Sequence, residues 1–275
     1  MAITTLKELL DAGVHYGHRT SRRNPKMDPF IFGKRHSIHI LDIRETLRGL
    51  IKGTRFLQRI AEEGKQALLV GTKNQASGII EEAAARAQMP YVTSRWLGGI
   101  LTNFRTIRSR LSRLEELEAL DETGEINNYS KKMIATLNRE KRKIKENLDG
   151  IRNMNRLPGA LVIIDPRREK NAVREAVKLG IPVVALIDTD SDPDLIDIPI
   201  PGNDDAIRSI QLIIDKLTNA YVAGRSSYME GMEAKPLPEA AEAAAQPAAV
   251  AESVSTPEAG PQPETQDQPT ETATE

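Results

Sequence analysis

Residues 160–188 read ALVIIDPRREKNAVREAVKLGIPVVALID, and this stretch decides the fold class. Two unbroken apolar runs, Ala160–Ile164 and Val183–Ile187, enclose a segment with helical periodicity near residues 169–179. Unbroken apolar strands that alternate with helices are typical of a parallel sheet whose two faces are both covered. The stretch therefore predicts an α/β fold with a parallel, Rossmann-like sheet flanked by helices.

The same alternation extends toward both ends of the chain. Further strands are expected at Ile38–Leu41, Ala67–Val70 and Tyr91–Val92, with an edge strand near residues 197–200. Helices are expected near residues 44–63, from residue 74 to 87, and from the cap-like residues 203–205 to about residue 223. These elements assign residues 1–101 and 152–230 to one discontinuous α/β domain.

About 60 residues between the third and fourth predicted core strands carry no strand pattern, and they hold two helical apolar seams. The first seam consists of Phe104, Ile107, Leu111, Leu114 and Leu117. The second consists of Met133, Leu137, Ile144, Leu148 and Ile151. A polar turn at residues 121–130 joins them. Residues 102–151 are therefore expected to form an inserted antiparallel helical hairpin, a coiled coil that makes a second domain.

Composition and charge exclude several classes of function. The chain has no cysteine, which rules out disulfides, cysteine–zinc sites and thiol catalysis. It has neither an apolar run long enough to span a membrane nor the layout of a secretory signal, so a cytoplasmic protein is expected. The net charge of −1 hides an acidic end: residues 233–275 hold nine acids and one base. Residues 231–275 are expected to be a disordered acidic tail.

The basic excess lies at the front of the chain, where residues 1–60 carry 12 bases and 5 acids. Arginine and lysine in a turn-rich segment suit a surface that binds RNA phosphates, and the alternative is a solvated charged loop. The residues predicted to contact RNA are Arg19, Arg22, Arg23, Lys26, Lys34, Arg35, Arg95, Arg105 and Arg108.

The only tryptophan of the chain lies where the hairpin leaves the predicted sheet. Trp96, Gly98 and Gly99 follow the third core strand and precede the first helical seam. Trp96 is therefore interpreted as an anchor at the junction of the two domains rather than as a platform for stacking bases.

A histidine and several aspartates form a candidate metal site. His18 lies in a glycine-containing turn, and Asp188, Asp204 and Asp205 follow predicted strands of the sheet. Imidazole and carboxylate groups together suit a structural divalent metal. The alternative is that the histidine satisfies buried hydrogen bonds.

The sequence offers little for catalysis. Gly71-Thr72-Lys73 follows a strand and opens a helix, but no Gly-x-Gly-x-x-Gly or Walker motif is present, and no catalytic set is evident. The chain is therefore expected to be no enzyme and to take no cofactor or small-molecule substrate. A nucleotide-dependent enzyme on a doubly wound α/β fold stays as the alternative function.

Several ordered motifs resemble the bacterial small-subunit ribosomal protein two family. They are residues 13–18, 24–27 and 30–33 at the front, 70–73 and 95–108 in the middle, and 187–193 and 200–208 near the end. Together they span residues 5–226. One departure is visible, since Arg23 stands where the family usually has an aromatic residue before Asn24-Pro25-Lys26.

The resemblance implies a similar fold and a structural role in translation, as a ribonucleoprotein constituent of the small ribosomal subunit in the cytoplasm. It implies binding to small-subunit ribosomal RNA and to other ribosomal proteins, including help in docking ribosomal protein one. It also implies a divalent ion near His18, Asp188, Asp204 and Asp205 in some members. The acidic tail lies outside the resemblance.

Overall fold

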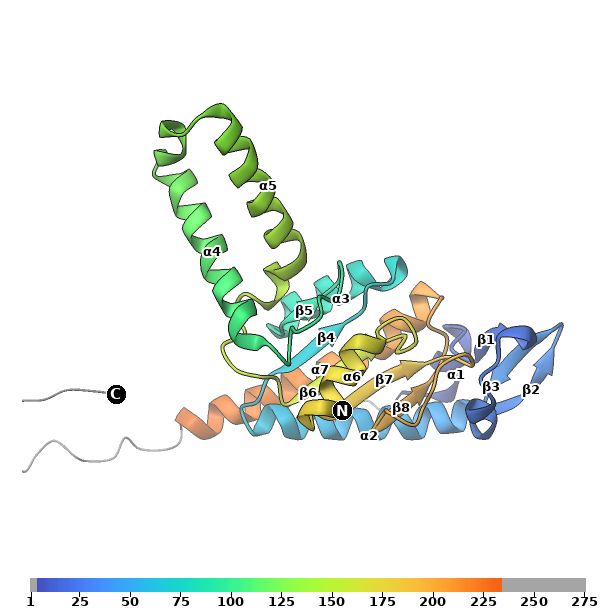
Figure 1. Ribbon diagram of the computed structural model, residues 1–275. Helices are drawn as coiled ribbons and strands as arrows, with labels where there is room; N and C mark the ends of the chain where they lie inside the picture. The colour runs from blue at the N-terminus through green and yellow to red at the C-terminus, as the bar shows by residue number, and fades with distance from the viewer. Residues whose placement is uncertain (1–3, 234–275) are drawn as a thin grey trace, which may run out of the picture. The chain divides into compact units, whose positions relative to one another are not determined.

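The computed structural model describes residues 4–233 and contains a parallel sheet of five strands in the order β5-β4-β6-β7-β8 (Figure 1). The strands are β4 (Ala67–Val70), β5 (Tyr91–Val92), β6 (Ala160–Ile164), β7 (Val183–Ile187) and β8 (Ile198–Pro201). Every residue of β4, β6 and β7 is buried, which explains why these strands are apolar throughout. The predicted α/β class with a parallel sheet is confirmed.

Different elements cover the two faces of this sheet. On one face the apolar core joins α2 (Ile43–Glu62), α3 (Asn74–Ala87) and α7 (Ile207–Glu233), and Leu9 of α1 (Leu6–Asp11) adds to it. On the other face the core joins α6 (Lys170–Leu179), η4 (Asp149–Ile151) and the loop that carries Trp96. Both faces are therefore closed, as a parallel sheet requires.

The chain order places a switch point between β4 and β6. From β4 the chain continues to β5 on one side, and it then returns to β6, β7 and β8 on the other. Loops at the carboxyl ends of strands diverge at such a point, and in open α/β sheets ligands bind there. Three of the predicted metal-site residues, Asp188, Asp204 and Asp205, follow β7 and β8 at this edge of the sheet.

The last helix, α7, is longer than predicted. It runs from Ile207 to Glu233, whereas its end was expected near Ala223. Gly224 lies inside this helix, where a Cβ would collide with the backbone oxygen of Gln58 in α2. The glycine allows two helices to approach closely, and it does not end the helix. The predicted tail 231–275 lies outside the described residues, apart from 231–233, which end α7.

A small antiparallel sheet precedes α2, in the order β1-β3-β2. Its strands are β1 (Tyr16–Arg19), β2 (Ile31–Arg35) and β3 (Ile38–Leu41), and the short helices η1 (Thr20–Arg22) and η2 (Pro25–Phe30) lie between β1 and β2. Ile38–Leu41 belongs to this antiparallel sheet, so its predicted place among the parallel strands was wrong. Strands β1 and β2, which are short and contain glycine, were not predicted.

Two helices, α4 (Phe104–Glu122) and α5 (Lys131–Leu148), run side by side in Figure 1, with η3 (Glu125–Asn128) between them. Ile107, Leu111, Leu114 and Leu117 of α4 are buried, as predicted. Met133 is 46% exposed, so its place in the second seam was wrong. Leu137 and Leu148 of α5 are buried and Ile144 is half-buried, as predicted, and Ile134 takes the inward position that was assigned to Met133. The coiled coil and the division into two domains stay predictions.

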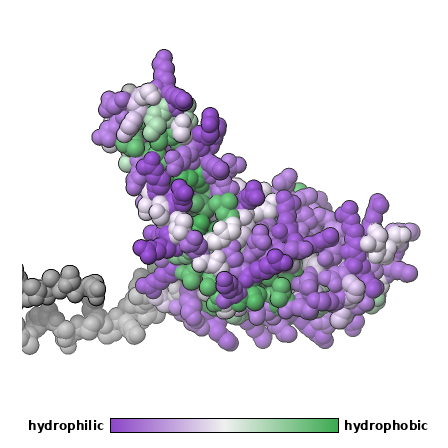
Figure 2. All heavy atoms as spheres, in the orientation of Figure 1, coloured by the Kyte–Doolittle hydropathy of each residue, from purple (hydrophilic) through white to green (hydrophobic). Residues whose placement is uncertain are grey.

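No helix in residues 4–233 combines the length and the apolar character that a bilayer crossing demands. Hydrophilic residues cover most of the face of the molecule drawn in Figure 2.

Candidate nucleic-acid interface and metal centre

Six of the nine basic residues predicted to bind RNA are exposed, and the described part of the chain offers them no ion-pair partner within 4.0 Å. They come from the front sheet and η1, from the loop after β5, and from the first turn of α4. We call these six residues the open cations: Arg19, Arg22, Lys34, Arg35, Arg95 and Arg105.

The other two basic residues of the front segment are already paired. Arg23 Nη1 lies 3.1 Å from Asp28 Oδ1. Lys26 Nζ lies 2.9 Å from Asp192 Oδ2 and also contacts Asp194. Hydrogen bonds to Asp194 and Asp192 raise the pKa of Lys26. Both side chains are exposed, but neighbouring carboxylates offset their charge.

Arg108 turns toward the protein instead of toward solvent. Its Nη1 donates to the backbone oxygens of Arg152 and Met154, at 3.4 and 3.5 Å. These long bonds join α4 to the segment that follows η4. Arg108 is therefore placed to support the base of α4, whereas Arg105 is exposed one turn earlier.

The junction residues converge on one carboxylate that the sequence analysis missed. Glu175 of α6 accepts hydrogen bonds from Trp96 Nε1 (3.1 Å) and from the Gly99 amide (2.8 Å) through Oε1. Its Oε2 accepts from the amides of Leu101 and Thr102 and from the Thr102 hydroxyl, each at 3.1 Å. Gly99 adopts a positive φ of 94°, which permits this turn. Gly98 is exposed.

Glu175 is half-buried, and its pKa reflects two opposing effects. Burial raises the pKa of this carboxyl, but the donors from Gly99, Thr102, Trp96 and Leu101 together hold it below its usual value. Trp96 itself is 7% exposed. This geometry suits an anchor, and the role of Trp96 at a domain junction stays a prediction. The only sequence signal for Glu175 is an acid that borders the apolar face of its helix.

Three of the four predicted metal-site residues lie together at the carboxyl edge of the sheet. Single donor atoms of His18, Asp188 and Asp204 all lie within 4.8 Å of one another. His18 Nδ1 is 2.9 Å from Asp188 Oδ2, although the contact is not aligned as a hydrogen bond. Asp188 outweighs the effect of burial and raises the pKa of His18 to about 9.

Asp204 is the acid of this cluster whose pKa is raised most. It is 1% exposed, and its Oδ2 has no hydrogen-bond partner among the described residues. Burial, together with the charges of Asp188 and Asp165, raises the pKa of Asp204 to about 7, although Lys73 opposes this effect. Lys73 Nζ lies 2.8 Å from Asp204 Oδ1. The cluster therefore gathers more negative charge than its own groups compensate.

Asp205, the fourth predicted ligand, is divided between two partners. Its Oδ1 lies 2.5 Å from Lys73 Nζ, and its Oδ2 lies 3.4 Å from His18 Nε2. The carboxylate is 56% exposed, unlike Asp188 and Asp204. It borders the cluster rather than completing it.

The loop after β4 has an internal acceptor where a phosphate would otherwise bind. The Thr72 amide donates to Glu169 Oε1 at 3.1 Å, and the Thr72 hydroxyl donates to the same atom at 2.5 Å. Glu169 is 3% exposed, and burial raises its pKa. A carboxylate of the chain thus takes the donors that a nucleotide phosphate would need at the switch point.

Comparisons with known proteins agree on one family. The family model described as "Ribosomal protein S2" matches residues 9–224. A protein named "Small ribosomal subunit protein uS2" from Rhodopirellula baltica is 59% identical over 245 residues, which cover 89% of this chain and 94% of that protein. Proteins of the same name from Borreliella burgdorferi (strain ATCC 35210) and Synechococcus elongatus are 52% and 51% identical, over 81% and 82% of this chain and 85% and 90% of theirs.

Proposed function

The chain belongs to the ribosomal protein S2 family, and from this premise we propose that it binds the RNA of the small ribosomal subunit through phosphate contacts. The single observation that supports this most strongly is the set of open cations. Six exposed bases without ion pairs in residues 4–233 are available to contact the phosphates of an RNA.

Family membership gives the chain a structural role in translation, on the ribosome in the cytoplasm, and not that of an enzyme. The alternative of a nucleotide-dependent enzyme is therefore dropped. The use of Thr72 as a donor to Glu169 agrees with this, because the Thr72 amide and hydroxyl already donate within the protein.

The open cations suit recognition of shape more than of sequence. Arg19, Lys34 and Arg35 lie on β1 and β2, which both pair with β3, so the sheet fixes their spacing. Arg95 and Arg105 lie on either side of the segment held by Glu175. Rigid presentation of charge positions a protein on an RNA backbone, whereas base edges are needed to read sequence.

The test is the binding of purified protein to small-subunit ribosomal RNA across a salt series. A front variant with Arg19→Gln, Arg22→Gln and Arg35→Gln should bind more weakly and lose about 2 units of the slope of log affinity against log salt. The matched control is Lys65→Gln, Arg86→Gln and Arg113→Gln, because these bases are already paired with Glu63, Asp215 and Glu116. Equal effects of both variants would contradict the proposal.

We also propose that His18, Asp188 and Asp204 hold a structural divalent cation. The cluster fits such a group because Asp204 Oδ2 is buried without a hydrogen-bond partner within the described residues, and a donor atom of each of the three residues lies within 4.8 Å of the others. A cation bound there would supply positive charge and link β1 to the loops after β7 and β8. A mixed set of imidazole and carboxylate donors suits zinc or manganese better than calcium.

Calorimetric titration of Zn²⁺ and Mn²⁺ into metal-stripped protein tests this site. One ion per chain is expected to bind, and His18→Gln should weaken binding by about tenfold or more. His36→Gln is the control, because His36 is exposed on the turn between β2 and β3. No binding heat, together with no stoichiometric metal by elemental analysis of dialysed protein, would contradict the site.

The third proposal is that the chain helps to dock ribosomal protein one. Its support is the family resemblance together with exposed aromatic surface on the small sheet: Phe32 of β2 is 72% exposed and Tyr16 of β1 is 51% exposed. Aromatic side chains with this exposure are typical of surfaces that a protein partner covers. Phe32→Ser should lower the occupancy of protein one on purified subunits, whereas Tyr129→Ser on the loop before α5 should not. Equal occupancy would refute this.

A further inference from the structure

Helix α2 carries five basic residues along one face. Their spacing of four, four, three and four residues places them within an arc of about 80° around the helix axis. All five are exposed, and the buried residues of α2, such as Gly53 and Leu57, lie on the opposite side. We call these residues the α2 stripe: Arg44, Arg48, Lys52, Arg55 and Arg59.

Most of the stripe has no compensating charge. Arg44 pairs with Asp42 at 3.2 Å and Arg48 with Glu45 at 2.5 Å, both at the start of the helix. Lys52, Arg55 and Arg59 have no ion pair in the part of the chain that the structure describes. Glu62, at the end of the same face, accepts a hydrogen bond of 2.8 Å from Gln58. Glu62 and Glu63 follow at the end of the helix, so the part of the stripe without ion pairs, from Lys52 to Arg59, lies between two paired bases and two acids.

The stripe is rigid and of useful length. From Arg44 to Arg59 it extends for about 22 Å, at 1.5 Å for each helical residue. The packing of α2 against α7 and β8 holds it in place, since Gly49 and Gly53 allow close approach to β8 and Leu217. One α-helical turn separates neighbouring cations, a distance comparable to the spacing of phosphates along an extended RNA strand.

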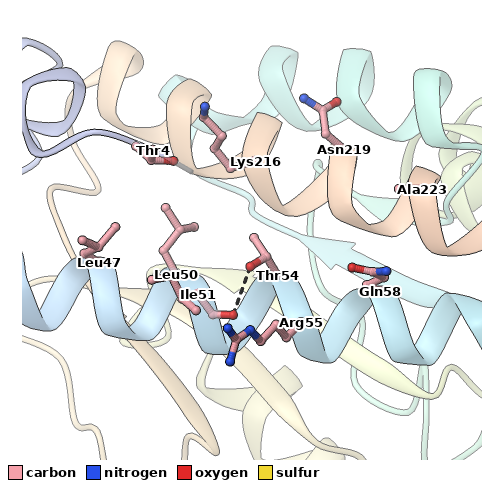
Figure 3. Close-up of a pocket in the computed structure, with 10 residues that line it drawn as sticks. All are labelled: Thr4, Leu47, Leu50, Ile51, Thr54, Arg55, Gln58, Lys216, Asn219 and Ala223. Carbon is pink, nitrogen blue, oxygen red and sulfur yellow. Dashed lines mark hydrogen bonds between the residues drawn. The ribbon is translucent and has the colours of Figure 1, made fainter. Parts of the chain in front are cut away.

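A groove of about 600 Å³ lies beside the stripe and is lined by residues of both α2 and α7 (Figure 3). Leu47, Leu50 and Thr54 line its α2 side, and Lys216 and Asn219 line its α7 side. Arg55 and Gln58 also line it, so one member of the stripe stands at its border. The groove borders the stripe at Arg55, and the accessibility of the stripe rests on the exposure of its five side chains.

The stripe continues the front basic segment. Helix α2 begins directly after β3, and the Asp42 amide that precedes it donates to the backbone oxygen of Phe30 at 2.9 Å. The sheet that carries Arg19, Lys34 and Arg35 therefore adjoins the first turn of α2. The front cations and the stripe are therefore carried by elements that are connected directly in the chain.

We propose that the α2 stripe is a second RNA-phosphate contact surface of this protein, formed mainly by Lys52, Arg55 and Arg59. This proposal rests on the proposed binding of small-subunit RNA and extends it to a surface outside the predicted RNA-binding residues. An RNA backbone fits the stripe better than an acidic protein, because α2 exposes no large apolar side chain that a protein interface would bury.

The experiment compares two purified full-length variants in binding to small-subunit ribosomal RNA across a salt series. The stripe variant carries Lys52→Gln, Arg55→Gln and Arg59→Gln, and glutamine keeps a high helix propensity. The control variant carries Lys65→Gln, Arg86→Gln and Arg113→Gln, which remove the same charge from bases already paired. Circular dichroism establishes that both fold.

The stripe variant is expected to lose roughly 2 units of the salt slope, since each lost phosphate contact removes about 0.7–0.9. The control should keep the slope of the wild-type protein. An unchanged slope in the stripe variant, while the front variant loses affinity, would overturn this proposal and leave the proposed function intact. If the wild-type protein fails to bind, the proposed function fails first. Normal RNA binding with impaired incorporation into subunits would assign the stripe to a protein partner and overturn the RNA assignment.

Discussion

Removal of the Glu175 carboxylate should loosen the base of α4. In the wild-type protein this group accepts five hydrogen bonds from three segments of one loop, at Trp96, Gly99 and residues 101–102. Glu175→Ala removes every acceptor at once and leaves the donors in place. The perturbation is therefore confined to the loop that leads from β5 into α4.

The loss in the free energy of unfolding depends on which of these donors water can reach in the variant. Trp96 and Leu101 are buried and Gly99 is partly buried, whereas Thr102 is exposed and can donate to water. At about 1 kcal/mol for each of the three less accessible donors, Glu175→Ala should cost about 3 kcal/mol in the free energy of unfolding. Glu82→Ala is the control, because Glu82 is an exposed glutamate on α3, and such changes cost less than about 0.5 kcal/mol.

Urea unfolding followed by the fluorescence of Trp96, the only tryptophan, measures this cost directly. The effect should also depend on pH. Since the folded-state pKa of Glu175 is lowered, its stabilising contribution is present above the unfolded pKa near 4.5 and is lost as the pH falls through the folded pKa. The difference in the free energy of unfolding between the wild-type protein and Glu175→Ala should therefore become smaller at acidic pH.

Hydrogen exchange at the amides of residues 99, 101 and 102 gives the second measurement. Their protection should fall in Glu175→Ala and stay unchanged in Glu82→Ala. A cost below about 1 kcal/mol with unchanged protection would refute the view that this carboxylate holds the loop.

Three further predictions follow from individual contacts. Arg22→Ala should weaken RNA binding more than Arg23→Ala, because Arg23 already pairs with Asp28; filter binding at two salt concentrations checks this, and equal losses would contradict it. The raised folded-state pKa of Glu169 means that its ionisation lowers the free energy of unfolding as the pH rises through that pKa. Glu169→Gln should therefore reduce the loss of stability between pH 4 and 7. Urea unfolding of both proteins at the two pH values measures this difference. Gly224→Val should cost more than about 2 kcal/mol, because its side chain would collide with α2, and a thermal midpoint near that of the wild type would refute this contact.

The parallel sheet was predictable because burial dictates its composition. Strands β4, β6 and β7 lie where the apolar runs predicted them, since every residue of each is buried. The small sheet was not predictable to the same extent. Strands β1 and β2 pair with β3, and both show irregular register, so no alternation of apolar and polar residues marks them.

The candidate site was predictable by residue type but not by side-chain partner. The sequence suggested nine bases for RNA, yet Lys26 pairs with acids more than 160 positions away, and Arg108 donates to backbone oxygens. The role of Glu175 as an acceptor was not predictable because its hydrogen-bond donors lie more than 70 residues away in the sequence. Long-range pairing decides which charges remain available, and spacing along the sequence does not record it.

The salt dependence of binding to purified small-subunit ribosomal RNA tests the central claim most directly. The six open cations alone predict a slope of roughly 4 in log affinity against log salt, at about 0.7 for each contact, and the three uncompensated residues of the α2 stripe raise it to roughly 6. A steep slope of this size is the expected result. Binding that is absent, or that does not change with salt, would contradict the account.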